Sequence, residues 1–527
     1  MKNLFIILFV SITYNYAFSQ TWNIGTQTCL GGSLDEDIQG TLKLSNGNFL
    51  IYGTSKSGVS GDKTEPNLGN TDIWLVALNQ NLQIIWEKSF GGNLLDGANK
   101  IIESSNNELY ILATSASGIS ATKSEICFGN NDIWLIKIDL NGNIIWDKTI
   151  GGTLYETAVD ILELDSGNIL ISGTSDSDVS GNKTSPLIGN YDEWIIKLNS
   201  NGVIIFDKTI GGLGDESDGK LLELNSNEII ICSSSTSNIS GNKTENSFGG
   251  SDYWLIKIDT NGNILNNKTI GGSSYEMQTN ISKLINGNFI ISCTTDSPSS
   301  GLKTENNFGS YDTWILEINS QFNIIRQKTI GSNNIDGVYF AKQLINNNIL
   351  IGMCSDSDVN LYKSEPRIGN SNKDQWFVVI DENFNKISDK TIGTPGIEIL
   401  GNVLETSNNN FIVFGSSSGT NINDKTCVGN GSRDYWIYNL STNLGLEEIE
   451  NSSFTLYPNP VKNELSIQTD LQIEQIEIQN LEGKNLVSLV EFDNSKTISL
   501  NQLNSGIYLC KLTLIDGKME VIKFVKE

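Results

Sequence analysis

A repeat of 60 residues constrains the fold of this chain more than any other feature. A Gly-Gly pair marks the repeat and recurs at residues 31, 91, 151, 211 and 271, with Gly-Ser at 331. An Asp-x-Trp motif keeps the same period, with tryptophans at Trp74, Trp134, Trp194, Trp254, Trp314, Trp376 and Trp436. The step 376 − 314 = 62 indicates a small insertion before Asp374. The chain therefore contains seven copies of one structural unit.

Each copy is predicted to contain four β-strands. In the second complete copy, residues 132–139 and 144–150 are rich in β-branched residues and flank Asn141-Gly142, a pair that favours a tight hairpin turn. A polar loop leads to residues 158–164, and a second turn leads to residues 169–174. A long segment rich in Ser, Gly, Asn and Lys then precedes the next Asp-x-Trp. No stretch shows the 3.6-residue periodicity of an amphipathic helix.

Seven such units predict a β-propeller, because a β-helix has much shorter repeats. The two ends of the repeat region complement each other. Residues 22–30 correspond to the second strand of a hairpin, whereas residues 434–440 form a first strand without a second. Pairing these segments closes a ring and removes two sheet edges. The predicted fold is all-β, with a seven-bladed β-propeller followed by a small C-terminal immunoglobulin-like β-sandwich.

Three polar positions recur in all seven copies. The long loop carries a lysine at Lys63, Lys123, Lys183, Lys243, Lys303, Lys363 and Lys425. A carboxylate follows the glycine pair at Glu36, Asp96, Glu156, Glu216, Glu276, Asp336 and Glu398. The motif aspartates are Asp72, Asp132, Asp192, Asp252, Asp312, Asp374 and Asp434.

Alternate connections of a four-stranded blade lie on the same face, so the lysines and the first set of carboxylates share one face of the disc. One interpretation is a ring of ligand contacts around the channel mouth. In the other, each lysine pairs with a nearby carboxylate or carbonyl and holds its own loop. Identical use in every blade favours the second interpretation, because a ligand breaks sevenfold equivalence. The Asp-x-Trp motif is predicted to be structural, with Trp between blades and Asp bound to loop amides.

Two further patterns bear on chemistry. Asp176-Ser-Asp178 and Asp356-Ser-Asp358 are similar to the opening of a calcium loop, although the remaining EF-hand ligands do not follow. Calcium is thus the candidate cofactor, at Asp176, Asp178, Asp356 and Asp358. A carboxylate pair for glycoside hydrolysis is not excluded among 61 acidic residues, but no unique pair stands out, and no catalytic residue is assigned.

Composition excludes several function classes. The chain has no histidine, which excludes Ser-His and Cys-His catalysis and imidazole metal ligands. Its formal net charge of −26 argues against nucleic acid and anionic lipid as partners. The seven cysteines are an odd number without CxxC pairs, a poor framework for disulfides or zinc. We expect Cys232, Cys293 and Cys354 to be buried free thiols.

The ends of the chain indicate export. Residues 1–20 have a lysine, a short apolar run and small residues near the end, as in a secretory signal peptide. No other stretch is apolar enough for a membrane helix, so the mature chain is predicted to have no membrane span. The predicted propeller occupies residues 21–444, a linker 445–452 and a second domain 453–527.

The last 75 residues or so carry several motifs in a fixed order, namely Tyr457-Pro458-Asn459-Pro460, Gly483, Gly506-Ile507-Tyr508 and the basic final strand with Lys526. This segment resembles the type A C-terminal sorting domain of type IX secretion system cargo. The resemblance implies a Gram-negative bacterium, passage through the periplasm, recognition by the type IX machinery, and release or attachment at the outer surface. Residues 21–444 are similar to uncharacterised propeller repeats found with this tail.

These observations favour an exported or cell-surface propeller that acts as a binding scaffold for a glycan or a partner protein. One alternative is a secreted carbohydrate-active hydrolase that uses two carboxylates. Another is a structural component of adhesion or biofilm. A deep pocket with one asymmetric acid pair favours the hydrolase, whereas equivalent blades around a smooth channel do not.

Overall fold

The computed structural model describes residues 20–360, 362–369, 373–444, 454–469, 473–480, 484–490, 495–514 and 519–527. Residues 1–19 of the predicted signal peptide, the whole predicted linker 445–452 and Gly483 lie outside the described residues. The chain forms two compact units, of which one is Ser19–Asn443 and the other contains the C-terminal strands.

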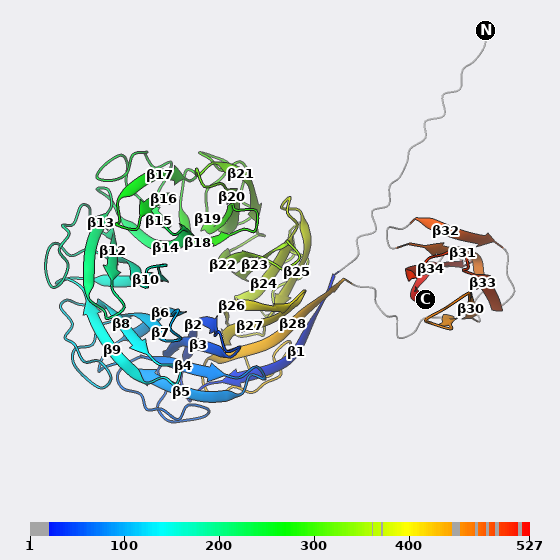
Figure 1. Ribbon diagram of the computed structural model, residues 1–527, viewed down its shortest axis with the longest axis horizontal. Coiled ribbons are helices and arrows are strands. Elements are labelled where there is room, and N and C mark those ends of the chain that lie inside the picture. The colour runs from blue at the N-terminus through cyan, green and yellow to red at the C-terminus, as the bar shows by residue number, and fades with distance from the viewer. Residues whose placement is uncertain are drawn as a thin grey trace, which may run out of the picture. The chain divides into compact units, whose positions relative to one another are not determined.

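The first unit is a ring of seven four-stranded antiparallel sheets, as Figure 1 shows face-on. The innermost strands of blades 1 to 7 are β2 (Glu36–Lys43), β6 (Asp96–Glu103), β10 (Glu156–Glu163), β14 (Glu216–Asn225), β18 (Glu276–Lys283), β22 (Asp336–Gln343) and β26 (Glu398–Ser407). The second strands are β3 (Phe49–Ser55), β7 (Leu109–Ser115), β11 (Ile169–Ser175), β15 (Glu228–Ser235), β19 (Phe289–Thr295), β23 (Ile349–Ser355) and β27 (Asn410–Ser417).

The third and outermost strands complete each blade. The third strands are β4 (Asp72–Leu78), β8 (Asp132–Ile138), β12 (Asp192–Leu198), β16 (Asp252–Asp259), β20 (Asp312–Ile318), β24 (Asp374–Ile380) and β28 (Asp434–Leu444). The outermost strands are β5 (Ile84–Phe90), β9 (Ile144–Ile150), β13 (Ile204–Ile210), β17 (Ile264–Ile270), β21 (Ile324–Ile330), β25 (Lys386–Ile392) and, in blade 7, β1 (Gln20–Leu30). The predicted seven-bladed fold is confirmed.

The pairing of β1 with β28 closes the ring, as the complementary ends predicted. Gln27 of β1 accepts a hydrogen bond from the Trp436 indole and donates one to the carbonyl of Asp424. The Trp22 ring stacks on Phe377, with ring centroids 6.3 Å apart. Blade 7 is therefore built from both ends of the repeat region.

One expectation from the cysteines is wrong. Cys29 of β1 forms a disulfide with Cys427, and the two Cα atoms are 5.6 Å apart. This bond could not be predicted from the sequence, because its cysteines are 398 residues apart and come together only when the ring closes. Cys232, Cys293 and Cys354 are buried free thiols, as expected.

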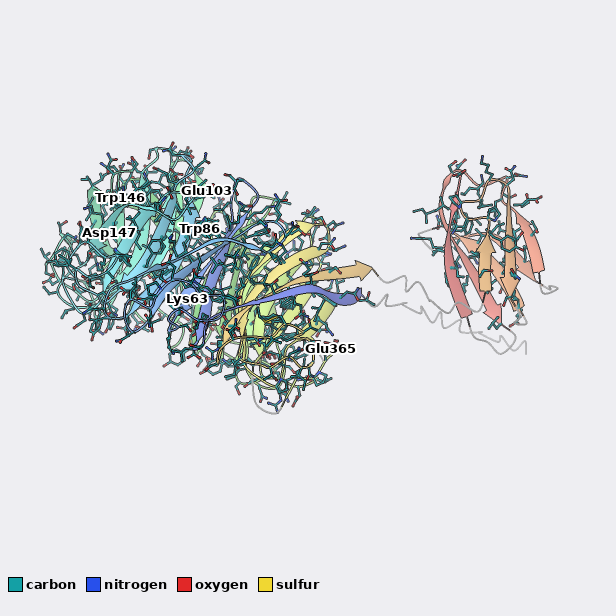
Figure 2. All side chains as sticks on the ribbon, turned by 90° about the horizontal axis from the view of Figure 1, so that it is seen from below. Lys63, Trp86, Glu103, Trp146, Asp147 and Glu365 are labelled. Carbon is teal, nitrogen blue, oxygen red and sulfur yellow. A yellow bond between two sulfur atoms is a disulfide. The ribbon has the colours of Figure 1, made fainter. Side chains whose placement is uncertain are left out.

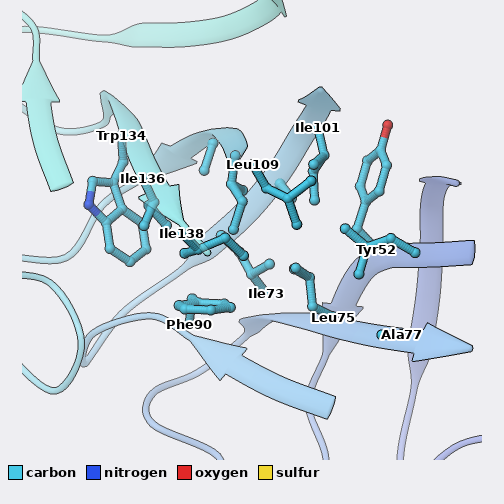
Figure 3. Packing of buried hydrophobic residues seen from close by; sticks show 14 of the residues in the cluster. Tyr52, Ile73, Leu75, Ala77, Phe90, Ile101, Leu109, Trp134, Ile136 and Ile138 are labelled. Atoms are coloured by element: carbon cyan, nitrogen blue, oxygen red, sulfur yellow. The ribbon is translucent and has the colours of Figure 1, made fainter. Parts of the chain in front are cut away.

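Neighbouring blades share hydrophobic cores. The third strands are rich in apolar residues and are largely buried on both faces, as β8 illustrates. Between blades 1 and 2, Ile73 and Leu75 of β4 pack with Ile101 of β6 and with Trp134 and Ile136 of β8 (Figure 3). A single sheet cannot bury such a strand alone, so the blades stabilise one another.

The C-terminal unit consists of two antiparallel sheets around one core. One sheet contains β29 (Phe454–Tyr457), β30 (Glu464–Thr469) and β33 (Ser495–Ser499). The other contains β31 (Ile473–Gln479), β32 (Asn485–Val490), β34 (Gly506–Leu514) and β35 (Met519–Lys526). In the part of the chain that the structure describes, no helix has the length and hydrophobicity that a membrane span requires.

Candidate functional site

The repeated lysines and carboxylates lie in the loops of one face, but beneath its surface. The seven lysines and the seven carboxylates that follow the glycine pair are at most 2% exposed. In Figure 2, Lys63 lies on the side of the ring away from Glu103, which ends an innermost strand. These buried side chains are not available as surface contacts for a ligand.

Their hydrogen bonds hold the loops of each blade. In blade 3 the Lys183 ammonium donates to Thr209 (2.8 Å) and to the Ser185 carbonyl (2.6 Å). The ammonium also lies 5.6 Å from the centroid of the Trp194 ring. Glu156 accepts hydrogen bonds from the Gly152 amide (2.8 Å) and from a second-strand serine. These contacts support the interpretation that the repeated residues serve the blade.

The motif aspartates cap the same loops. Asp132 Oδ2 accepts the Phe128 amide at 2.5 Å, and the equivalent contact occurs for Asp192 with Ile188. Asp132 Oδ1 lies beside the first glycine of the pair, because a Cβ on Gly151 would be 2.0 Å from it. Only glycine therefore fits there.

A fourth repeated position was missed in the sequence. Each motif tryptophan donates its indole N–H to one side chain, which is 13 residues further along the chain in blades 1 to 6. The acceptors are Glu87, Asp147, Asp207, Asn267, Gln327, Asp389 and, from β1, Gln27. The regular 13-residue spacing was the available signal.

The calcium candidates take part in loop hydrogen bonds. Asp176 Oδ1 accepts the Tyr155 amide at 2.7 Å, and Asp356 Oδ1 accepts the Ile335 amide at 2.7 Å. Asp358 forms an ion pair with an arginine at 3.3 Å, and Asp178 accepts a loop amide at 3.4 Å. Among the described residues no group of three or more acidic, histidine or cysteine side chains is placed to hold a metal ion. Calcium binding stays a prediction.

The seven blades line the central channel with different residues, so they are not equivalent there. A cavity of about 700 Å³ lies among the innermost strands, and all seven blades contribute to its wall. This volume is typical of a small-molecule site. The lining is mainly polar, with threonines, amides and four charged side chains, and it includes one aromatic residue, Tyr339.

A β-bulge in every innermost strand contributes at least one residue to this lining. Shortly after its buried carboxylate, each strand has one residue more than the second strand it pairs with. Five strands leave one residue without a register partner there, whereas β14 and β18 place two residues against one. The bulged residues are Gln39, Asn99, Val159, Asp218-Gly219, Gln278-Thr279, Tyr339 and Gly401. The blades share a backbone irregularity but fill it with different chemistry, and this variation in otherwise similar repeats was the signal that sequence reasoning overlooked.

Two of the bulges hold strained backbone. Asp218 and Gln278 have φ angles of 62° and 58°, in the left-handed region that side chains other than glycine rarely adopt. Such strain persists only where the surrounding structure enforces it, and it is concentrated at functional sites. Both residues line the channel.

The charges of the lining balance. Asp37 contacts Arg433 in an ion pair, and Asp218 and Lys220 contribute the other two charges. The channel is thus neutral in a chain whose net charge is −26.

An unusual acid lies behind the channel wall. Glu193 follows a motif aspartate, where other blades have Ile, Tyr, Thr or Gln, and its side chain is fully buried. Its Oε1 accepts a hydrogen bond from Ser233 at 2.7 Å, and a Cβ on Gly219 would lie 2.4 Å from its Oε2. Burial raises the pKa of Glu193 to about 8. The carboxyl group is therefore protonated at neutral pH.

We expect Glu193→Gln to reduce the pH dependence of stability. The pKa of this acid is higher in the folded chain than the ordinary 4.5, so its stabilising contribution is complete below pH 4.5 and is lost as pH rises through 8. A glutamine keeps the shape of the side chain without its charge. Relative to the parent chain, the free energy of unfolding of the variant should be higher at pH 9 than at pH 5 by an amount on the order of 3 kcal/mol. Denaturant unfolding of the variant and the parent chain at both pH values measures this difference, and Glu382→Gln at an exposed position is the control. Equal pH dependence in Glu193→Gln and the parent chain contradicts the prediction.

The motif residues of the C-terminal unit contact its last two strands, β34 and β35. Asn459 accepts the Val525 amide at 2.9 Å, which ties the Tyr-Pro-Asn-Pro segment to β35. The Tyr508 ring of β34 stacks on Phe524 at 5.9 Å. Lys526, near the end of β35, is buried. The motif thus spans one connected part of the second unit.

Residues 455–527 match the family of secretion system C-terminal sorting domains. The predicted resemblance of the tail is confirmed, and the chain carries a sorting domain at its C-terminal end. No curated protein matches the sequence.

Several solved structures are similar to the chain. A protein of unknown function from Dyadobacter fermentans is 12% identical, with a TM-score of 0.36, over 66% of this chain and 94% of that one. A PL25 polysaccharide lyase described as an ulvan lyase is 12% identical, with a TM-score of 0.45, over 77% and 97% of the two chains. A puromycin hydrolase is 8% identical, with a TM-score of 0.44, over 92% and 59%. The fold assignment rests on the seven sheets rather than on these similarities.

Proposed function

We propose that this chain is an exported protein whose propeller binds an extracellular ligand in the central channel. The observation that carries the proposal is the channel wall, where the bulge shared by the blades holds an amide, a carboxylate, an aliphatic residue, an aromatic residue or a glycine, depending on the blade. A ligand without sevenfold symmetry makes different contacts with each blade, so its binding site requires different residues in the different blades. The loops around it are built alike in all blades, and their repeated polar residues are buried.

The wall favours binding over hydrolysis. A glycosidase needs two carboxyl groups that face one space. Asp37 and Asp218 are the carboxylates that line the cavity, and Asp37 is engaged by Arg433. Glu193 has the raised pKa of a general acid but lies behind the backbone of Gly219, away from a bound ligand.

The sorting domain supports export by the type IX secretion system. The disulfide at the ring closure agrees with this destination, because such bonds persist in oxidising compartments. The ligand is accordingly a component of the cell surface or of the surrounding medium, and attachment to that surface gives the chain its place of action.

Removal of residues 453–527 should retain the propeller in the periplasm. The two units have separate cores, so the propeller should still fold while it loses the part that the secretion machinery recognises. Immunoblots of periplasm, outer membrane and medium measure the distribution in a type IX-competent host. Undiminished export of the shortened chain contradicts the proposed role of the C-terminal domain in type IX secretion.

Blocking the channel tests the binding role. Gln39 is an exposed lining residue, and Gln39→Trp places a large side chain in the cavity. We expect the full chain to bind a fraction of cell-envelope or secreted polymers, and Gln39→Trp to bind it much less. Gln321→Trp, an exposed turn residue remote from the cavity, serves as the matched control. Equal binding by the two variants contradicts the proposal.

A further inference from the structure

We infer that the ligand of the channel is an uncharged, polyhydroxylated chain, that is, a neutral glycan segment. The inference rests on the proposed function and specifies the chemistry of the same site. Three features of the wall support it: two oriented amide groups, one aromatic ring and a neutral balance of charge.

The first amide is fixed by a hydrogen-bond relay. Thr114 Oγ1 accepts the backbone amide of Ala158 at 3.0 Å, and it donates its own proton to Asn99 at 3.0 Å. The atom of Asn99 that receives this proton must be the carbonyl oxygen, Oδ1. The Nδ2 group, with two N–H donors, is therefore directed away from Thr114, and Asn99 lines the cavity.

The second amide repeats this arrangement. Thr294 Oγ1 accepts the amide of Val338 at 3.1 Å and donates to Gln278 Oε1 at 3.0 Å, which leaves Nε2 as a donor. Asn99 belongs to blade 2 and Gln278 to blade 5. In a ring of seven, blades three steps apart are as distant as any two can be. Asn99 and Gln278 thus line the channel from nearly opposite sides.

The remaining wall suits the ring of a sugar. Tyr339 of blade 6 is 36% exposed and presents an aromatic surface to the channel. Hydroxyl groups accept hydrogen bonds from amides, while the C–H face of a pyranose packs on an aromatic ring. Thr54, Thr157 and Thr174 add hydroxyls that both donate and accept.

Charge argues against acidic ligands. The lining contains two acidic and two basic side chains, and the chain as a whole carries −26. A uronic or sulfated polymer would approach this protein against long-range repulsion and meet no net positive charge in the channel.

Calorimetric titration of the full chain tests the inference with three probes: neutral gluco- and manno-oligosaccharides, an oligouronate and a neutral peptide of similar length. A neutral oligosaccharide should bind. Asn99→Asp with Gln278→Glu converts both donors to acceptors and should weaken that binding at least tenfold. Tyr339→Ala should weaken it similarly, whereas Tyr339→Phe should stay within about threefold. Asn201→Asp, an exposed turn residue, is the control for added charge.

The outcomes separate this inference from the proposed function. Binding of the oligouronate or the peptide alone overturns the neutral glycan, as does undiminished sugar binding by the double variant. In either case, if Gln39→Trp loses binding to envelope polymers, the proposed function still holds, because the channel is then the binding site. If Gln39→Trp also binds normally, both the inference and the proposed function fail.

Discussion

A chain that begins at Gly31 rather than Gln20 is expected to lose the stable ring. Without β1, blade 7 has three strands, β28 becomes an open edge, and the buried indole of Trp436 loses its acceptor, Gln27. The Cys29–Cys427 bond is lost as well. Unsatisfied buried groups cost about 1–3 kcal/mol each and a disulfide contributes about 2–4 kcal/mol. The total loss is on the order of 5 kcal/mol or more, comparable with the whole stability of many domains.

Denaturant unfolding and size-exclusion chromatography measure this loss. The shortened chain should unfold at a much lower denaturant concentration or aggregate through the exposed edge. Cys29→Ser with Cys427→Ser keeps β1 in place and should cost only about 2–4 kcal/mol, which separates the covalent link from the strand. An unchanged unfolding midpoint after removal of β1 contradicts the closure.

The second large effect is expected from Gly151→Ala. The added Cβ would lie 2.0 Å from Asp132 Oδ1 and 2.9 Å from Glu156 Oε2, and both carboxylates are fully buried. Neither can move freely, because Asp132 accepts the Phe128 amide and Glu156 accepts the Gly152 amide. The overpacking should cost about 3 kcal/mol.

Gly118→Ala provides the matched control in a neighbouring blade. Its Cβ meets nothing within 4 Å and its φ lies outside the left-handed region. The change should alter stability by less than about 0.5 kcal/mol. Thermal unfolding of the two variants measures the difference. Similar midpoints for both contradict the account of the glycine pair.

The sequence predicted the propeller because its strong signals are local and repeated. Asn141-Gly142 and the Asp-x-Trp motif each fix a turn or a strand, and seven copies make the period certain. The closing strand was also predictable, since residues 22–30 lacked a partner. The disulfide was not, because only the closed ring brings Cys29 to Cys427.

The candidate site was predicted less well, for a related reason. Recurrence in every blade already favoured a structural role for the repeated lysines and carboxylates, and their burial supports that role. The channel depends on the residues that do not recur, such as Asn99 and Tyr339. Their importance follows from the bulge that places them at the wall, and register shifts of this kind are set by the assembled sheet.

Hydrogen exchange of the full chain, with and without a bound envelope polymer, tests the central claim most directly. The bulged residues have no partner in the second strands, so their amides should exchange readily in the free protein. The account predicts that the polymer slows exchange around Asp218, Gln278 and Tyr339 and leaves the outermost strands unchanged. Protection confined to the outermost strands, with the bulges unaffected, would contradict it.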